Sequence, residues 1–132
     1  MKVLVLGGAG YIGSHICKAL ALMNHQTMVL DNLSTGHREA VRWSQFIEAD
    51  ILDAEALLSI LQDAGPFDLI MHFCAKSLVG ESVQNPALYY RNNVAGTLNL
   101  LDAMVATGHD KLVFSSTAAV FGLPEQDLID EQ

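Results

Sequence analysis

A glycine-rich turn near the amino terminus is the first stretch whose residue types could bind a ligand. Residues 7–13 read GGAGYIG and contain two overlapping patterns, Gly7-x-x-Gly10-x-x-Gly13 and Gly8-x-Gly10-x-x-Gly13. Glycine at this spacing lets the backbone turn tightly and lets a pyrophosphate approach the main chain. A helix that follows such a turn offers unpaired N–H groups and a partial positive charge. The turn therefore predicts a phosphate-binding cradle.

A hydroxyl cluster near the other end of the sequence could bind an alcohol. The stretch FSSTAAVFG spans residues 114–122, in which an apolar run leads into Ser115, Ser116 and Thr117. A neutral hydroxyl can hydrogen-bond a substrate alcohol, but it cannot act as a general base at neutral pH. Chemistry at this cluster would therefore need a partner group.

An acidic residue follows the glycine turn at the distance that a dinucleotide requires. Asp31 ends the second apolar run, about 20 residues after the turn, where a carboxylate can accept hydrogen bonds from an adenosine ribose. The same charge repels a 2′-phosphate, so Asp31 predicts NAD rather than NADP. We interpret Arg38 as a surface residue rather than as a ligand for that phosphate.

These residues must be positioned by elements that alternate along the chain. Apolar runs at 2–7, 27–31, 45–50, 67–73 and 111–116 predict five strands, and amphipathic stretches at 11–23, 53–63 and 86–107, with a weaker one at 36–43, predict helices. Asn85-Pro86 favours a helix start and Gly108 a helix stop. Strands that alternate with helices indicate an α/β fold with a doubly wound parallel sheet.

Composition narrows the class of protein. The chain has 132 residues, close to the roughly 150 expected for one domain, and 51% of them are hydrophobic. No apolar stretch approaches the roughly 18 residues of a membrane span, so we expect a soluble protein with no membrane partner. A net charge of −8 argues against a nucleic-acid partner. The two cysteines, Cys17 and Cys74, fit reduced thiols and a cytoplasmic protein better than a disulfide framework or a metal site.

Five stretches, in order along the chain, give a specific resemblance. They are GGAGYIGSH, LDNLSTG, EADI, HFCAKSLVGESVQNPALYYRNNVAGTLNLL and FSSTAAVFG. Together they resemble the amino-terminal part of UDP-glucose 4-epimerases, a family of extended short-chain dehydrogenases/reductases. The resemblance implies a Rossmann-type sheet that binds NAD, and a reaction that interconverts UDP-glucose and UDP-galactose by hydride transfer at C4 through a 4-keto sugar.

The resemblance also implies roles for individual residues. The pyrophosphate would be held by Gly7, Gly10, Tyr11, Ile12 and Gly13, and the adenosine ribose by Asp31, Asn32, Leu33, Ser34, Thr35 and Gly36. The adenine would lie beside Asp50 and Ile51, and the middle of the cofactor beside Phe73, Cys74 and Ala75. The nicotinamide half would lie over Asn92 or Asn93. Thr117 matches the residue that hydrogen-bonds the reacting sugar hydroxyl. Lys76 stands one place before the position of a lysine often found in the family.

For some of these residues a purely structural role is the alternative. Tyr11 and Ile12 could be core residues of a first helical turn, and Asn92 or Asn93 a polar group bonded inside a helix. We interpret His72 as a core histidine with satisfied hydrogen bonds. No metal ligand set is expected.

The family's catalytic base is a tyrosine in a Tyr-x-x-x-Lys pair, and this sequence has none. Tyr11 is followed four places later by His15, Tyr89 by Asn93, and Tyr90 by Val94. We therefore expect residues 1–132 to be an NAD-binding Rossmann domain whose carboxy-terminal part, with the substrate domain, is missing. An unprotected last strand favours self-association, so we expect a homo-oligomer. A UDP-hexose would be a partner only of the longer enzyme.

Two alternatives remain at the level of sequence. Another nucleotide-sugar enzyme of the same family, a dehydratase or a decarboxylase, would share most of these motifs. Dehydratases typically carry an Asp-Glu pair directly after the family threonine, where this chain has Ala118 and Ala119. A nonenzymatic module that binds NAD would also lack Tyr-x-x-x-Lys. Coding sequence beyond Gln132 would separate that alternative from the enzymes.

Overall fold

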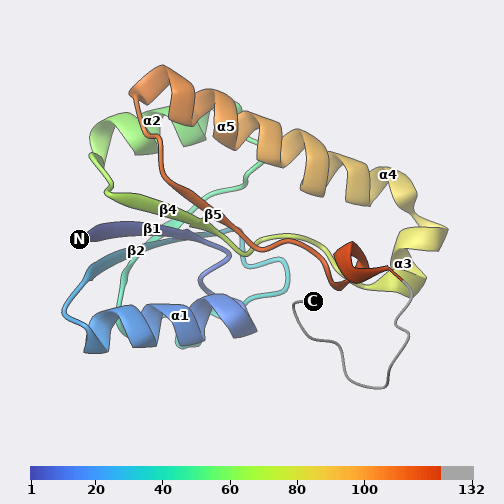
Figure 1. Ribbon diagram of the computed structural model, residues 1–132, viewed down its shortest axis with the longest axis horizontal. Helices are drawn as coiled ribbons and strands as arrows, with labels where there is room; N and C mark the ends of the chain where they lie inside the picture. Colours follow the sequence, from blue (N-terminus) through green and yellow to red (C-terminus); the bar gives the residue numbers. More distant parts are fainter. Residues whose placement is uncertain (123–132) are drawn as a thin grey trace.

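The chain folds around a parallel sheet of five strands, and the computed structural model describes residues 1–122. The strands lie in the order β3-β2-β1-β4-β5, and every neighbouring pair is parallel. They are β1 (Lys2–Leu6), β2 (Gln26–Asp31), β3 (Gln45–Glu48), β4 (Leu69–His72) and β5 (Leu112–Phe114). Helices cover both faces, as Figure 1 shows with α1 on one side and α2 with α5 on the other. The predicted α/β class and doubly wound parallel sheet are confirmed.

The helices and short turns occupy the crossovers between the strands. They are α1 (Tyr11–Leu22), the 3₁₀ turn η1 (Arg38–Ala40), α2 (Ala54–Asp63), α3 (Val79–Gln84), α4 (Pro86–Tyr89), the π-helical segment η2 (Tyr90–Ala95), α5 (Gly96–Thr107) and the 3₁₀ turn η3 (Ala118–Phe121). The start and stop signals act as predicted: the Asn85 side chain accepts from the Leu88 N–H, and Gly108 closes α5 with a φ of 74°.

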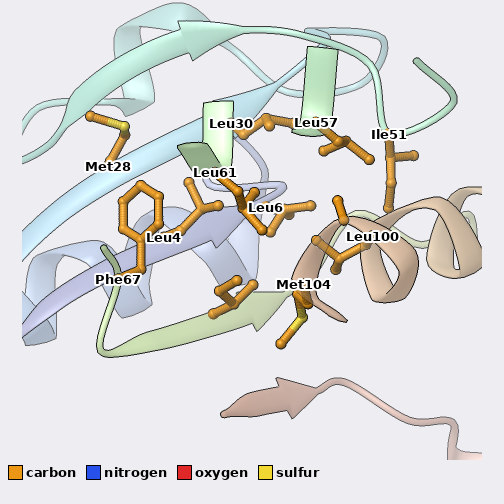
Figure 2. Packing of buried hydrophobic residues seen from close by; sticks show 12 residues of the cluster. Leu4, Leu6, Met28, Leu30, Ile51, Leu57, Leu61, Phe67, Leu100 and Met104 are labelled. Carbon is orange, nitrogen blue, oxygen red and sulfur yellow. The ribbon is translucent and has the colours of Figure 1, made fainter. Parts of the chain in front are cut away.

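The core has two layers because β1 is central and apolar on both faces. Val3 and Val5 face α1, where they pack with Cys17 and Val29. The intervening Leu4 and Leu6 face the opposite side, where they form the larger cluster with side chains of α2 and α5 (Figure 2). Alternating side chains of one strand thus stabilise both layers, and burying each large apolar side chain contributes about 1.5–3 kcal/mol.

The strands predicted at 45–50 and 111–116 are shorter in the structure, at Gln45–Glu48 and Leu112–Phe114, and α3 was not predicted. Three further predicted elements differ. The weak helix at 36–43 is only the three-residue turn η1, because this short stretch contributes no buried residue that would hold a longer helix in place. The single helix at 86–107 is instead α4, η2 and α5 in succession, with a π-helical segment in the middle. The strand predicted at 67–73 is Leu69–His72. The Phe73 N–H still donates to the Leu6 carbonyl of β1, and side chains of η2 bind the backbone from Cys74 onward.

Candidate functional site

A cavity of about 320 Å³ lies at the carboxyl ends of β1, β2 and β4. The chain passes from β1 to β2 and β3 on one side of the sheet and returns to β4 on the other, so β1 and β4 flank the topological switch point. Open α/β sheets bind their ligands at this place. The lining comprises Gly7, Gly10, Leu30, Asp31, Asn32, Ser34, Thr35, Ala49, Ile51, Phe73, Cys74, Ala75, Lys76, Ser77, Leu78, Glu81, Tyr89 and Asn92.

The glycine turn forms one wall of the cavity, and close packing explains its composition. Gly7 has a φ of 77°, and a side chain there would lie 2.6 Å from the carbonyl of Phe73. A Cβ at Gly13 would lie 2.2 Å from the carbonyl oxygen of Gly7, so the helix approaches the turn as only glycine allows. Gly8 packs against Val29 and does not line the cavity. Close packing therefore requires glycine at both positions 7 and 8, and of the two only Gly7 lines the cavity.

Helix α1 begins at the turn without a capping side chain. Its N-cap is Gly10, and its first turn carries no acidic residue. The first N–H groups of a helix have no partner within the helix, so those of Tyr11, Ile12 and Gly13 are available to an anion. The side chains of Tyr11 and Ile12 are 82% and 55% exposed, which excludes their interpretation as core residues. Neither residue lines the cavity.

Asp31 connects the glycine turn to the loop that follows β2. Its carboxylate is 8% exposed and accepts the N–H of Ala9 at 2.9 Å and the N–H of Leu33 at 2.8 Å. Each carboxylate oxygen has a second lone pair, so Asp31 can still accept from a ligand hydroxyl in the cavity. The carboxylate both orders the turn and charges the floor of the cavity.

The loop after β2 is held by short hydrogen bonds of its own. Asn32 donates to Asp50 at 2.9 Å and accepts the N–H of Ser34 at 3.0 Å. Leu33 has a φ of 56° and does not line the cavity, whereas Ser34 and Thr35 do. The loop therefore contributes two hydroxyl-bearing residues to the lining, close in sequence to Asp31.

Two predicted residues act as supports behind the lining. A Cβ at Gly36 would lie 2.8 Å from the carbonyl carbon of Ala9, so Gly36 packs against the glycine turn. Asp50 accepts from Asn32 and from the Leu52 N–H and lies outside the lining. Ile51, by contrast, is buried and lines the cavity. Leu30 and Ala49, which were not predicted from the sequence, line it beside Ile51. These three side chains form an apolar slot.

The segment after β4 forms the opposite wall. Phe73, Cys74 and Ala75, which were predicted to contact the middle of the cofactor, line the cavity. Burial, followed by the negative charges of Asp31 and Asp50, raises the pKa of the Cys74 thiol to about 12. Cys74 is therefore a neutral, apolar part of the wall at physiological pH.

Both asparagines of η2 bind the backbone of this wall. Asn92 donates to the carbonyl of Cys74 at 2.9 Å, while Asn93 accepts the N–H of Lys76 at 2.8 Å and donates to its carbonyl at 2.9 Å. Asn92 lines the cavity and Asn93 does not. The π-helical turn brings these adjacent side chains to the same segment. Asn93 is therefore a support of the wall rather than part of its lining.

The wall continues through residues that the sequence reasoning did not select: Lys76, Ser77, Leu78, Glu81 and Tyr89. No repeating pattern marks them, because they lie in a loop and two short helices. The resemblance offered the only signal, since Lys76 stands beside a family lysine position.

Thr117 and His72 lie outside the cavity. Thr117 is exposed and accepts the N–H of Ala119 at 3.2 Å, which starts η3. His72 is 1% exposed and lies 3.4 Å from the Thr97 hydroxyl, but its Nδ1 has no hydrogen-bond partner among the described residues. The prediction of a core histidine is right, and the prediction that its hydrogen bonds are satisfied is wrong. Burial lowers the pKa of His72.

Other kinds of site are not evident over residues 1–122. No three His, Cys, Asp or Glu side chains come together there in a group that could hold a metal ion. None of the helices in that range is long and apolar enough to cross a membrane.

Known proteins are similar to this chain in sequence and in fold. The UDP-glucose 4-epimerase of Rhizobium meliloti (strain 1021) is 51% identical over 130 residues, which cover 98% of this chain and 39% of the relative. The crystal structure of UDP-glucose 4-epimerase from Brucella ovis in complex with NAD matches with a TM-score of 0.91 at 50% identity, covering 98% of this chain and 40% of that one.

A third comparison includes a sugar nucleotide. The UDP-glucose 4-epimerase of Stenotrophomonas maltophila, crystallised with NAD and formylated UDP-arabinopyranose, matches with a TM-score of 0.91 at 37% identity over 99% of this chain and 41% of that one. The chain thus spans about two fifths of the length of these relatives. The NAD dependent epimerase/dehydratase family matches residues 3–132, and the chain belongs to this family.

Proposed function

We propose that residues 1–132 are the NAD-binding part of a UDP-glucose 4-epimerase. The observation that carries the proposal is one cavity that is lined both by Gly7 and Gly10, the N-cap residue of α1, and by Asp31. Anion-binding N–H groups and a ribose-binding carboxylate are the two features that an adenine dinucleotide requires. The relatives crystallised with NAD support the choice of cofactor.

The residues of the cavity fit such an occupant. The N–H groups at the start of α1 would bind the pyrophosphate, and a side chain at Gly10 would fill the space that the phosphates need. Asp31 would accept from the ribose and repel a 2′-phosphate. The slot formed by Leu30, Ala49 and Ile51 would hold the adenine, and the wall from Phe73 to Ala75 the middle of the cofactor.

For the reaction of the longer enzyme, the bound dinucleotide would supply a reversible hydride acceptor for C4 of a UDP-hexose. Thr117 would hydrogen-bond the reacting sugar hydroxyl. None of the three tyrosines in the sequence is followed four places later by lysine, so this chain does not contain the tyrosine base that the proposal requires. We therefore expect NAD binding without epimerisation from these residues alone.

Calorimetric titration of the chain with NAD and, separately, with NADP tests the proposal. We expect binding of NAD and much weaker binding of NADP. An assay with UDP-galactose on the same sample should show no turnover. Equal affinity for the two cofactors would contradict the role of Asp31, and turnover would contradict the requirement for the tyrosine base.

We also propose that the protein self-associates through α5. Leu98, Leu101 and Val105 of α5 lie on one face and are 54%, 38% and 82% exposed, and Val94 of the preceding η2 is 50% exposed. Sedimentation of the chain at micromolar concentration should show a species larger than the monomer, and Leu98→Lys should reduce it to the monomer. A wild-type monomer would contradict the proposal.

Free thiols at Cys17 and Cys74 support a reducing compartment, and we propose the cytoplasm.

A further inference from the structure

Helix α3 begins at an unusual N-cap on the rim of the cavity. The N-cap residue is Leu78, whose apolar side chain makes no capping hydrogen bond. Glu81 occupies the third helical position, from which a glutamate ordinarily reaches back to the N–H of the N-cap residue. In this chain the Leu78 N–H has a different partner, so the helix start depends on a side chain from elsewhere.

That partner is the hydroxyl of Tyr89, the last residue of α4. The Leu78 N–H donates to the Tyr89 oxygen at 3.1 Å, and the hydroxyl lies 2.7 Å from Glu81 Oε2 and 2.9 Å from the Leu78 carbonyl oxygen. A phenol has only one proton to donate. The carboxylate is charged and closer, so the proton is directed toward Glu81. Tyr89 thus relays the bond that Glu81 would otherwise make with Leu78 directly.

The phenol is suited to this relay at neutral pH. Desolvation, followed by the hydrogen bond and negative charge of Glu81, raises the pKa of Tyr89 above its ordinary value of 10. The hydroxyl therefore remains a donor. The neighbouring Tyr90 is 69% exposed and its hydroxyl makes no hydrogen bond to residues 1–122, so the relay is specific to one of two adjacent tyrosines.

We propose that Glu81 and Tyr89 form a positioning pair that fixes the wall segment 76–81 of the cavity. Lys76, Ser77, Leu78, Glu81 and Tyr89 all line the cavity. Asn93 already binds both backbone groups of Lys76, and the pair binds the backbone two residues farther along, at Leu78. Together these contacts hold the loop to α4 and η2 without a neighbouring strand. The pair contacts the loop rather than reacting atoms, and its effect on NAD affinity rests on the proposed function.

Hydrogen exchange tests the pair without any ligand. In Tyr89→Phe we expect the Leu78 amide to exchange about tenfold faster than in the wild type, because its acceptor is lost. The matched control, Tyr90→Phe, should leave it unchanged. Glu81→Gln retains an oxygen that can accept from Tyr89 and should stay close to the wild type, whereas Glu81→Ala should accelerate exchange.

The double variant Glu81→Ala/Tyr89→Phe should exchange no faster than Tyr89→Phe, because the two residues act through one relay. Unchanged Leu78 exchange in Tyr89→Phe, additive effects in the double variant, or no difference between Glu81→Gln and Glu81→Ala would overturn the proposal. If circular dichroism shows that Tyr89→Phe does not fold, the comparison of Glu81→Gln with Glu81→Ala tests the proposal instead.

Titration with NAD then tests the consequence for binding. Loss of one hydrogen bond from the wall should weaken NAD binding about fivefold in Tyr89→Phe and leave it unchanged in Tyr90→Phe. If the Leu78 amide exchanges faster in Tyr89→Phe but the affinity for NAD is unchanged, the link between the pair and NAD binding is overturned. A wild-type chain that fails to bind NAD, with the exchange pattern intact, would overturn the proposed function alone.

Discussion

At the scale of single residues, Gly10 and Gly13 have different reasons to lack a side chain. A Cβ at Gly13 would lie 2.2 Å from a backbone oxygen, whereas at Gly10 the nearest atom is 3.3 Å away and the residue lines the cavity. Gly13→Ala should therefore lower the free energy of unfolding by about 3 kcal/mol through overpacking. Urea denaturation measures this change, and a fully stable Gly13→Ala would contradict the observed packing.

Gly10→Ala should instead act on binding. Gly10 has an extended backbone with a φ of −79°, which alanine adopts readily, so the free energy of unfolding should fall by less than about 1 kcal/mol. The added methyl group occupies the space proposed for the phosphates, and NAD affinity should fall about tenfold. Calorimetry on both variants separates the two glycines, and equal affinity of Gly10→Ala and wild type would argue against the phosphate position.

The Cys74 thiol gives a chemical test of the cavity wall. A pKa of about 12 leaves almost no thiolate near neutral pH, and the thiolate is the reactive form. Iodoacetamide should therefore label Cys74 at least about a hundredfold more slowly in the folded chain than in urea. Mass spectrometry of the peptides distinguishes Cys74 from Cys17. Rapid labelling of Cys74 in the folded chain would mean that the wall is open to solvent.

Residue types predicted the centre of the cavity better than its far wall. The glycine turn and Asp31 carry their own signal, because few residues tolerate a φ of 77° or repel a 2′-phosphate. Leu78 and Tyr89 carry none, since an apolar residue and a tyrosine have many uses and their meeting depends on how the chain turns at α3. Tyr11 and Ile12 show the opposite limit, because the sequence left open a core role for them and both residues are exposed.

At the scale of elements, the π-helical segment η2 determines how the loop after β4 is held. Asn93 satisfies both backbone groups of Lys76. Asn93→Ala leaves these groups without their partner and should lower the free energy of unfolding by about 1–2 kcal/mol, as measured by urea denaturation. Asn93→Asp keeps the acceptor for the Lys76 N–H and should lose less. Identical losses in the two variants would contradict this division.

The sequence could not predict this segment because helical periodicity describes only the regular helix. Residues 86–107 fit one amphipathic helix, and Asn85, Pro86 and Gly108 correctly mark its two ends. The wider turn at 90–95 places the adjacent Asn92 and Asn93 against the same segment of backbone, the one that follows β4. Such π turns often occur at functional sites. The reason for this one lies in the tertiary contact rather than in the local sequence.

At the scale of the whole molecule, the buried His72 makes stability depend on pH. Burial lowers its pKa in the folded chain below the ordinary value of 6.5. Below pH 6.5 the unfolded chain therefore binds a proton that the folded chain does not, so stability falls as the pH falls through this range.

The loss attributable to His72 is at most about 1.4 kcal/mol per pH unit. His72→Leu should lose less stability than the wild type when the pH is lowered from about 7.5 to about 5.5. Urea denaturation at the two pH values measures the difference. Equal losses would show that other groups account for the acid sensitivity.

The order in which the cavity's residues appear along the chain has a consequence for its synthesis. The lining runs from Gly7 to Asn92, whereas Gly96, which packs on the Ile51 side chain, and the core residues Leu100 and Met104 come later. A nascent polypeptide that has left the ribosome as far as Asn92 carries every lining residue found among residues 1–122. Because α5 is translated afterwards, we expect the end of the cavity at Ile51 to take its final shape only when the ribosome has released that helix.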